Sequence, residues 1–211
     1  MRITTRSRDD SMIIEAIRQA RASEAARTGL HCSTIVKDIA EGLQPPRDNL
    51  DESVGIAFQE IGNVIEDIIA DQLVQRFPEW TKPTPRTHRG VICSPDGWSP
   101  RARCIDEVKV TWKGMRDFLT LDDRGHVLGE SLKFVQYKMQ ILFYMQAWKA
   151  DRARLHVLFL NGTYRPPFPE PVTYLLRPTT TERVANEEMM IQHAQDRGWL
   201  ERRSNATHTL R

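Results

Sequence analysis

The spacing of apolar residues predicts helices in the first third of the chain. A run over residues 11–27 predicts a first helix, and a shorter run from a Ser33 cap to Gly42 predicts a second. A longer helix over residues 51–77 ends before Pro78. The apolar stripe of this third helix consists of Ile61, Ile65, Ile68, Ile69 and Leu73.

After the third helix the pattern changes to that of strands. Residues 89–93 and 103–112 are short β-branched runs joined by Pro-Asp-Gly turn chemistry, which predicts a hairpin. A loop through residues 121–130 leads to residues 131–150, where apolar side chains at helical spacing cover much of the surface, as in a buried helix. The remaining predicted elements are strands at 154–160 and 172–176 and a capped helix at 180–198. This order predicts an α/β sandwich around a mixed sheet.

The length of 211 residues favours one domain with helical additions. We expect an N-terminal helical extension over residues 1–50, a core over 51–200 and a flexible tail over 201–211. No apolar run approaches the roughly 18 residues of a membrane span, and the N-terminus lacks the pattern of a secretory signal. We therefore expect a cytoplasmic protein that does not enter a membrane. The three cysteines have no metal-type spacing, which favours buried or idle thiols.

The net charge of +2 is unevenly distributed along the chain. Residues 1–80 contain nine basic and fourteen acidic residues, whereas residues 81–116 contain eight basic and three acidic ones. A local basic excess is what a surface that binds a polyanion needs, although lysine and arginine on any solvated loop give the same pattern.

Three charged residues stand out within the predicted hairpin. Positions two apart in a strand face the same side, so Glu107 and Lys109 point together, while Asp106 faces the other side. Asp96 follows Pro95 in the predicted turn, and a hairpin can bring that turn beside the second strand. The sequence thus predicts two carboxylates and one ammonium group in one place.

Carboxylate oxygens are the ligands that Mg²⁺ or Mn²⁺ prefers, with water and substrate phosphate completing the shell. A bound ion can activate water for attack on phosphorus, and a nearby lysine can stabilise the transition state. The trio therefore predicts a site for phosphodiester hydrolysis. The alternative is a Glu–Lys surface pair on an edge strand beside an ordinary turn.

The flanking sequence resembles the PD-(D/E)XK nucleases, in particular the RecB-like branch found in phage exonucleases. The motifs are IGNVIEDIIADQL in the third helix, SPDG, IDEVKVTW, and QILFY in the helix that follows, over residues 50 to 165. The resemblance implies a restriction-endonuclease-like αβα sandwich. Its site residues would be Glu66, Asp96, Glu107, Lys109, Gln140 and Tyr144, with Asp96, Glu107 and Glu66 at Mg²⁺ or Mn²⁺.

The residues themselves agree with this assignment. Glu66 lies on a helical stripe otherwise suited to burial, so it either faces solvent or needs a metal, a lysine or an ordered water as partner. Gln136, Gln140 and Tyr144 recur every four residues and can orient Lys109, Glu107 or a phosphate; the alternative is that they serve packing.

Two departures narrow the resemblance. Three scattered cysteines cannot hold a four-cysteine iron–sulfur cluster, and no ATP-binding loop is present, so unwinding would need a partner. Family members of this size also often carry a histidine where Glu66 stands.

The function expected is that of a metal-dependent DNA nuclease, as an exonuclease in phage or bacterial recombination, replication or repair. Its partners would be DNA and a recombination or helicase protein, with a homo-oligomer left open. The first alternative is an inactive nuclease fold that binds DNA. The second is an interaction protein that uses its acidic first 80 residues.

Overall fold

A mixed sheet of four strands lies at the centre of the computed structural model, which describes residues 28–43, 52–124, 127–160 and 170–201. In spatial order the strands are β3 (Gly97–Ser99), β4 (Cys104–Thr111), β7 (Arg152–Phe159) and β8 (Glu170–Leu176). β4 and β7 run parallel, whereas β3 and β8 are antiparallel to their neighbours. The helix predicted over 11–27 and the tail from residue 202 lie outside the described residues.

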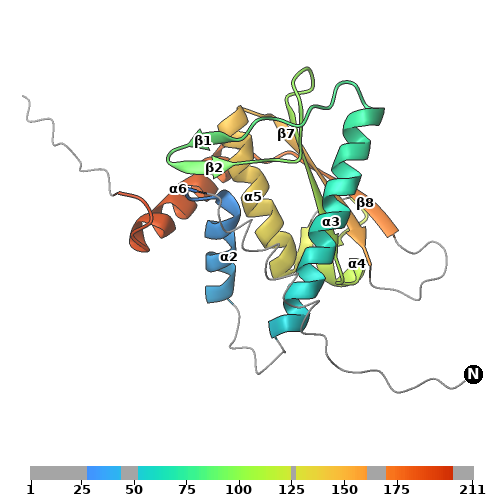
Figure 1. Ribbon diagram of the computed structural model, residues 1–211, viewed down its shortest axis with the longest axis horizontal. Helices are drawn as coiled ribbons and strands as arrows, with labels where there is room; N and C mark the ends of the chain where they lie inside the picture. The colour runs from blue at the N-terminus through green and yellow to red at the C-terminus, as the bar shows by residue number, and fades with distance from the viewer. Residues whose placement is uncertain (1–27, 44–51, 125–126, 161–169, 202–211) are drawn as a thin grey trace, which may run out of the picture.

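Helices lie on both sides of this sheet (Figure 1). α5 (Leu132–Trp148) packs with α2 (Cys32–Gly42) and α6 (Thr180–Asp196), and these three helices build the main core with Ile105 and the inward residues of β7. α3 (Glu52–Arg76) covers the other side of β4, where Ala70 and Trp80 enclose Val108. The expected α/β sandwich with a central mixed sheet is therefore confirmed.

The helix ends follow their capping residues, with one correction. Ser131 caps α5 by accepting a hydrogen bond from the Phe134 amide, and Thr179 and Glu182 form a capping box at α6. The predicted Ser33 cap of α2 is wrong, because the helix begins at Cys32 and His31 takes the extended N-cap conformation. Cys32 and Ile35 are both buried, and both lie within the helix.

The predicted hairpin is also wrong in its pairing. β2 (Val91–Cys93) pairs with β1 (Arg86–His88), and the antiparallel partner of β4 is the short β3. Pro95 has no amide hydrogen to donate to a neighbouring strand, and it lies in the break between β2 and β3. The tight turn that leads into β4 is therefore formed by residues 100–103 and not by the Pro-Asp-Gly sequence.

Part of the expected loop at 121–130 is regular structure. α4 (Met115–Phe118) is followed by β5 (Leu119–Leu121), which pairs with β6 (Val127–Glu130). Phe118 is fully buried, and its ring lies edge-on to Phe134 and Phe159. The Phe118 contacts hold the segment α4–β5–β6 beside the start of α5. These contacts are tertiary, so the local sequence does not predict them.

The predicted apolar stripe of α3 is buried only in part, because Ile69 and Leu73 pack against the cluster of Ala70, Trp80 and Val108 while other members face solvent. Ile61 and Ile68 are 50% and 58% exposed, whereas Gly62 and Ala70 are buried. Small residues face β4 because the helix approaches closely there: a Cβ on Gly62 would lie 3.6 Å from the Trp112 ring.

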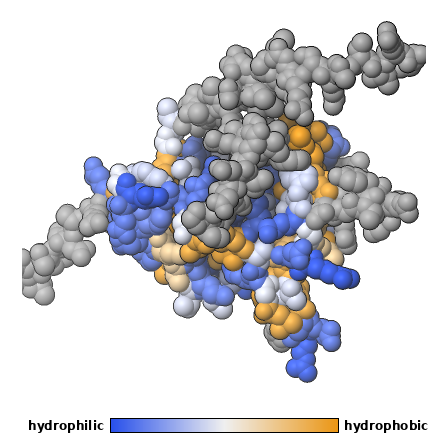
Figure 2. Space-filling view, turned by 90° about the horizontal axis from the view of Figure 1, so that it is seen from below, coloured by the Kyte–Doolittle hydropathy of each residue, from blue (hydrophilic) through white to orange (hydrophobic). Residues whose placement is uncertain are grey.

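Outside the core, apolar side chains form separate patches among hydrophilic ones on the face seen in Figure 2. Within the described residues, no helix combines the length and the apolar character that a bilayer span requires.

Candidate active site

β4 places Glu107 and Lys109 on one face of the sheet, as the strand alternation predicts. Glu107 is 1% exposed, and its Oε1 lies 2.8 Å from Lys109 Nζ. This face looks toward α5, because Glu107 and Lys109 lie opposite Leu155 and Val157 of β7, both in the main core. A carboxylate and an ammonium group are thus held together in a largely dehydrated place.

Two more carboxylates bind the edge of β4 where β3 stops. β3 pairs with β4 only as far as Asp106. Beyond it, the Val108 amide donates to Asp96 Oδ2 at 2.7 Å and the Val110 amide donates to Glu66 Oε1 at 2.8 Å. Side chains thus take the place of a neighbouring strand's carbonyls, which fixes the direction of both carboxylates. The predicted residues Asp96 and Glu66 are brought to Glu107 and Lys109.

The four side chains form one charged cluster. Lys109 Nζ lies 3.5 Å from Glu66 Oε2 in addition to its contact with Glu107. Burial alone would lower the pKa of Lys109, but Glu107, Glu66 and Asp96 together outweigh that effect and raise it. Three carboxylates around one ammonium group leave an excess of negative charge.

The pKa values of the three carboxylic acids are all raised. Burial raises the pKa of Glu107 to about 8, and the neighbouring Asp96 and Glu66 act in the same direction while Lys109 opposes them. Burial likewise raises the pKa of Asp96 and of Glu66. A site that disfavours its own carboxylate charges gains from an added cation.

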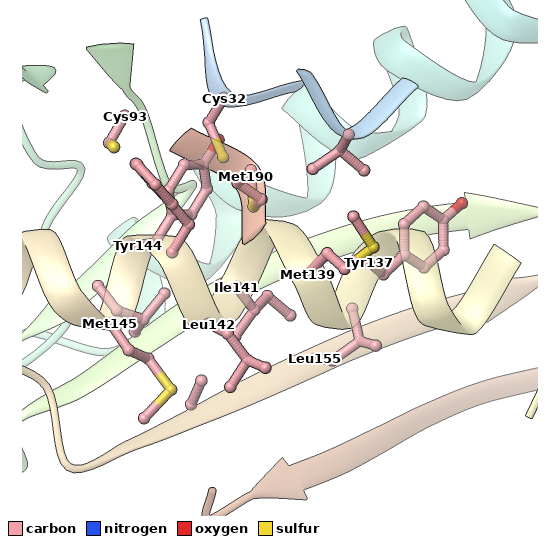
Figure 3. Packing of buried hydrophobic residues seen from close by; sticks show 14 of the residues in the cluster. Cys32, Cys93, Tyr137, Met139, Ile141, Leu142, Tyr144, Met145, Leu155 and Met190 are labelled. Carbon is pink, nitrogen blue, oxygen red and sulfur yellow. The ribbon is translucent and has the colours of Figure 1, made fainter. Parts of the chain in front are cut away.

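α5 supplies the amide and the phenol that the sequence predicted. Gln140 Nε2 donates to Glu107 Oε1 at 3.1 Å and to the Tyr144 hydroxyl at 2.8 Å. Tyr144 is 3% exposed and projects from α5 beside Cys32 (Figure 3). The structure thus joins Gln140 and Tyr144 to the carboxylate cluster, whereas Gln136 is half-buried outside this arrangement.

Tyr137 is a residue that sequence reasoning missed. Its hydroxyl donates to the Val110 carbonyl at 3.5 Å, and Lys109 Nζ lies 5.8 Å from its ring centroid. The signal was the spacing of Tyr137, Gln140 and Tyr144, which puts all three on one helical face. An aromatic residue in an apolar helix is read first as core, and Tyr137 serves both purposes.

The Oε2 atom of Glu107 is the main evidence that these residues suit a divalent cation. It is buried and has no hydrogen-bond partner among the described residues. Asp96 uses Oδ2 for the Val108 amide, so Oδ1 takes no part in that bond. Two carboxylate oxygens beside an excess of negative charge fit Mg²⁺ or Mn²⁺, which commonly bind one or two protein carboxylates together with water.

The part of the chain that the structure describes does not assemble a larger set of metal ligands. No group of three or more His, Cys, Asp or Glu side chains in the described ranges is arranged to hold a metal ion. Glu66 would have to give up its contacts with Val110 and Lys109 to become a direct ligand. The three cysteines are buried and unbridged, as predicted.

A second polar cluster ties the strands together on the opposite face. Asp106 is fully buried and accepts hydrogen bonds from Arg154 Nη2 at 3.0 Å and from His156 Nε2 at 3.2 Å. Ser99 lies 3.3 Å from Arg154, and Thr173 lies 2.9 Å from His156 Nδ1. One or two side chains from each strand therefore brace the sheet behind the carboxylates.

Comparison with solved structures gives a likeness along most of the chain. The crystal structure of SSO0001 covers 94% of this chain and 90% of its own, with a TM-score of 0.53 and 13% identity. The chain shares the fold of SSO0001. A phage-related exonuclease from Haemophilus somnus 129PT matches with 15% identity, coverage of 82% and 94%, and a TM-score of 0.47.

LHK-Exo, solved in complex with dAMP, matches with 11% identity, coverage of 80% and 89%, and a TM-score of 0.46. No protein-family model matches the sequence, and no curated protein matches it significantly. The likeness to SSO0001 therefore agrees with the fold, and the assignment of function depends on the site.

Proposed function

We propose that the protein is a metal-dependent deoxyribonuclease that hydrolyses phosphodiester bonds, acting as an exonuclease. The observation that carries the proposal is the convergence of Glu66, Asp96 and Glu107 on Lys109, with a buried oxygen of Glu107 lacking a partner. An edge pair on a strand would leave its charges in water. Here the charges are removed from water, which is costly for any oxygen that is neither paired nor bound to a ligand, and Glu107 Oε2 is such an oxygen among the described residues.

Asp96 and Glu107 would hold Mg²⁺ or Mn²⁺, and Glu66 would act through a water molecule. When bound, the ion would lower the pKa of a coordinated water and neutralise charge on the phosphate. Gln140 holds Oε1 of Glu107, so the carboxylate cannot rotate freely and Oε2 stays available. Tyr144 in turn fixes the Gln140 amide.

Lys109 would act on the attacking water and on the phosphoryl group. Its neighbours keep the ammonium group protonated, so it serves as a hydrogen-bond donor and a positive charge. Such a group stabilises the charge that develops on phosphorus, and removing one such group typically costs about 10²- to 10³-fold in rate.

The choice of an exonuclease follows the resemblance of the motifs to the RecB-like branch. The same resemblance is the basis for placing the protein in a bacterial or phage-infected cell with a recombination or helicase partner. Any ATP-driven unwinding would have to come from such a partner, since the sequence contains no ATP-binding loop.

The test uses end-labelled linear duplex, linear single-stranded and closed circular DNA with Mg²⁺, Mn²⁺ or EDTA. We expect metal-dependent loss of linear DNA, reduced at least about 100-fold by Lys109→Ala or Asp96→Ala. Lys37→Ala on α2 is the control, since Lys37 is exposed and pairs with Glu41. Full activity in Lys109→Ala would refute the site.

Two other outcomes would change the assignment. Cleavage of circles would make the protein an endonuclease. Retention of intact DNA under every condition would favour an inactive nuclease fold that binds DNA.

A further inference from the structure

Three large apolar side chains of α3 face solvent. Ile61, Val64 and Ile68 are 50%, 58% and 58% exposed, and their spacing of three and four residues places them along one side of the helix. This side is turned away from the sheet, because Ile69 and Leu73 pack on the sheet side. We call Ile61, Val64 and Ile68 the α3 ridge. An apolar helical stripe is normally buried against another element, and an exposed one marks an interaction site.

An acidic line runs beside the α3 ridge. Asp67 and Asp71 are both exposed and lie four residues apart, which is one turn of the helix. Residues 61–75 contain three acidic residues and no basic one. Lys82 lies 3.6 Å from Asp71, but both side chains are more than half exposed, so this is a weak surface pair. The α3 ridge therefore suits a helix that carries an apolar stripe with basic residues beside it.

The N-terminal segment of the same chain has this pattern. Residues 11–27 are predicted to form a helix, in which Ile13 and Ile17 lie on one side and Arg18 and Arg21 on the adjacent one. An isolated helix of this length is marginal in water, so its stability depends on packing its apolar side against another surface. The segment and the α3 ridge thus complement each other in both apolar and charged positions.

The described chain begins at a place from which this helix can reach α3. The Leu30 carbonyl accepts a hydrogen bond from the Ile92 amide at 2.7 Å. Asp96 follows Ile92 at a distance of at most about 14 Å, and the amides that bind Asp96 and Glu66 are about 7 Å apart along β4. A helix over residues 11–27 is about 25 Å long. Gly29, with a φ of 102°, allows the chain to turn where the helix ends.

Other exposed apolar side chains suit a helix less well. On α6, Val184 and Met189 are each 43% exposed, but a spacing of five residues turns them about 140° apart. Leu121, Val127 and Leu128 lie on the two-stranded ribbon β5–β6, which presents no helical stripe. The α3 ridge is therefore the best match among the described residues.

We propose that residues 11–27 form a helix that packs along the α3 ridge of the same chain. Its isoleucines lie on the ridge, and its arginines lie beside the acidic line of Asp67 and Asp71. This packing does not depend on nuclease activity, because the ridge and the carboxylate cluster lie on different sides of α3.

Hydrogen exchange of the full chain, measured by mass spectrometry, tests the packing. In the double variant Val64→Asp, Ile68→Asp, we expect the amides of residues 12–27 to exchange roughly 10- to 30-fold faster than in the parent, because two aliphatic contacts are lost. Leu128→Asp is the control, since Leu128 is 68% exposed on β6. It should leave exchange in this segment unchanged. Unchanged exchange in the double variant would overturn the proposal.

Charge reversal separates packing on α3 from helix formation within the segment. Arg18→Glu with Arg21→Glu should speed exchange of residues 12–27 about two- to fivefold, the range expected for surface ion pairs. Adding Asp67→Lys should recover part of the protection. Only a contact between the segment and α3 explains such a recovery. Equal exchange with and without Asp67→Lys would count against the proposed orientation of the arginines.

Two further results would overturn the proposal. The first is exchange of residues 12–27 in the parent at the rate of an unstructured peptide. The second is protection that rises with protein concentration, together with a dimer in sedimentation that Val64→Asp, Ile68→Asp dissociates, because the ridge would then bind a second copy. If that variant exchanges faster throughout the main core, it has lost its fold. Ile17→Asp then decides, since it alters no described residue and should speed exchange in the segment and at the ridge.

Discussion

Replacing Gly97 by alanine should destabilise the protein more than any other single methyl group added near the site. Gly97 follows Asp96 in the sequence and is buried. A Cβ at Gly97 would lie 2.0 Å from Trp80 Nε1 and 2.1 Å from Trp80 Cε2. Separations below 3.0 Å do not occur for real Cβ atoms, so the indole must move by more than 1 Å. Trp80 is 3% exposed and packs on Ala70 and Val108, so any shift of the indole disturbs this packing.

The cost follows from this geometry. Overpacking a core costs about 1–3 kcal/mol, and displacing a buried tryptophan approaches the roughly 3–5 kcal/mol of its removal. We expect a loss of about 3 kcal/mol in the free energy of unfolding for Gly97→Ala. For a chain of this size, that corresponds to a Tm lower by roughly 6–12 °C. Because Asp96 is adjacent, the activity should fall as well.

A matched glycine provides the control. A Cβ on Gly62 would also meet a tryptophan, but at 3.6 Å from Trp112, an ordinary contact. Since Gly62 lies within α3, alanine should be neutral or stabilise the helix by about 0.5–1 kcal/mol. Urea unfolding of both variants tests the reasoning. A Gly97→Ala stability within about 1 kcal/mol of the parent, or a greater loss in Gly62→Ala, would refute it.

Three further outcomes are expected. Gln140→Ala removes a hydrogen bond to the Glu107 carboxylate, worth about 1.5–3 kcal/mol, so initial cleavage rates should fall roughly 10- to 100-fold. Asp106→Ala leaves Arg154 without its buried partner and should cost about 3 kcal/mol in urea unfolding, the low end of the range because Arg154 is partly exposed; an unchanged midpoint would contradict this. The raised pKa of Glu107, about 8, means that the folded state binds more protons than the unfolded state between about pH 4.5 and 8. Stability in EDTA should therefore fall as pH rises through that interval, and Glu107→Gln should flatten the curve of Tm against pH; an equal slope in the variant would argue against Glu107 as the cause.

Alternation within one strand was enough to predict the pair Glu107 and Lys109, because a period of two is a local property. The buried character of α5 was equally local. Pairing between strands was not, since β3 has only three residues, Gly-Trp-Ser, and no hydrophobic pattern of its own. The predicted partner of β4 was therefore the more apolar run at Val91, which pairs with β1 instead.

The direction of α3 depended on tertiary contacts in the same way. Ile69 and Leu73 do face the sheet as predicted, but Ile61 and Ile68 do not, because the close approach to β4 selects Gly62 and Ala70 on the side that also aims Glu66 at the Val110 amide. Tyr137 was missed for a related reason. The Tyr137 side chain both packs in the core and contacts Val110 and Lys109. A sequence pattern cannot separate these two roles unless the residues that the side chain contacts are already known.

The proline before Asp96 has a physical explanation in this arrangement. Continuing the register of Gly97 with Asp106 would place Asp96 opposite Glu107 and Pro95 opposite Val108. Pro95 has no amide hydrogen to donate to β4, so the ladder ends there. The Val108 amide, which has no partner on β3, then needs another acceptor, and the Asp96 carboxylate accepts its hydrogen bond at 2.7 Å. The end of the β3–β4 pairing and the position of the Asp96 carboxylate therefore have the same cause. In a longer β3, backbone carbonyls would accept the hydrogen bonds of the β4 amides, and Asp96 would lose the bond to Val108 that fixes its direction.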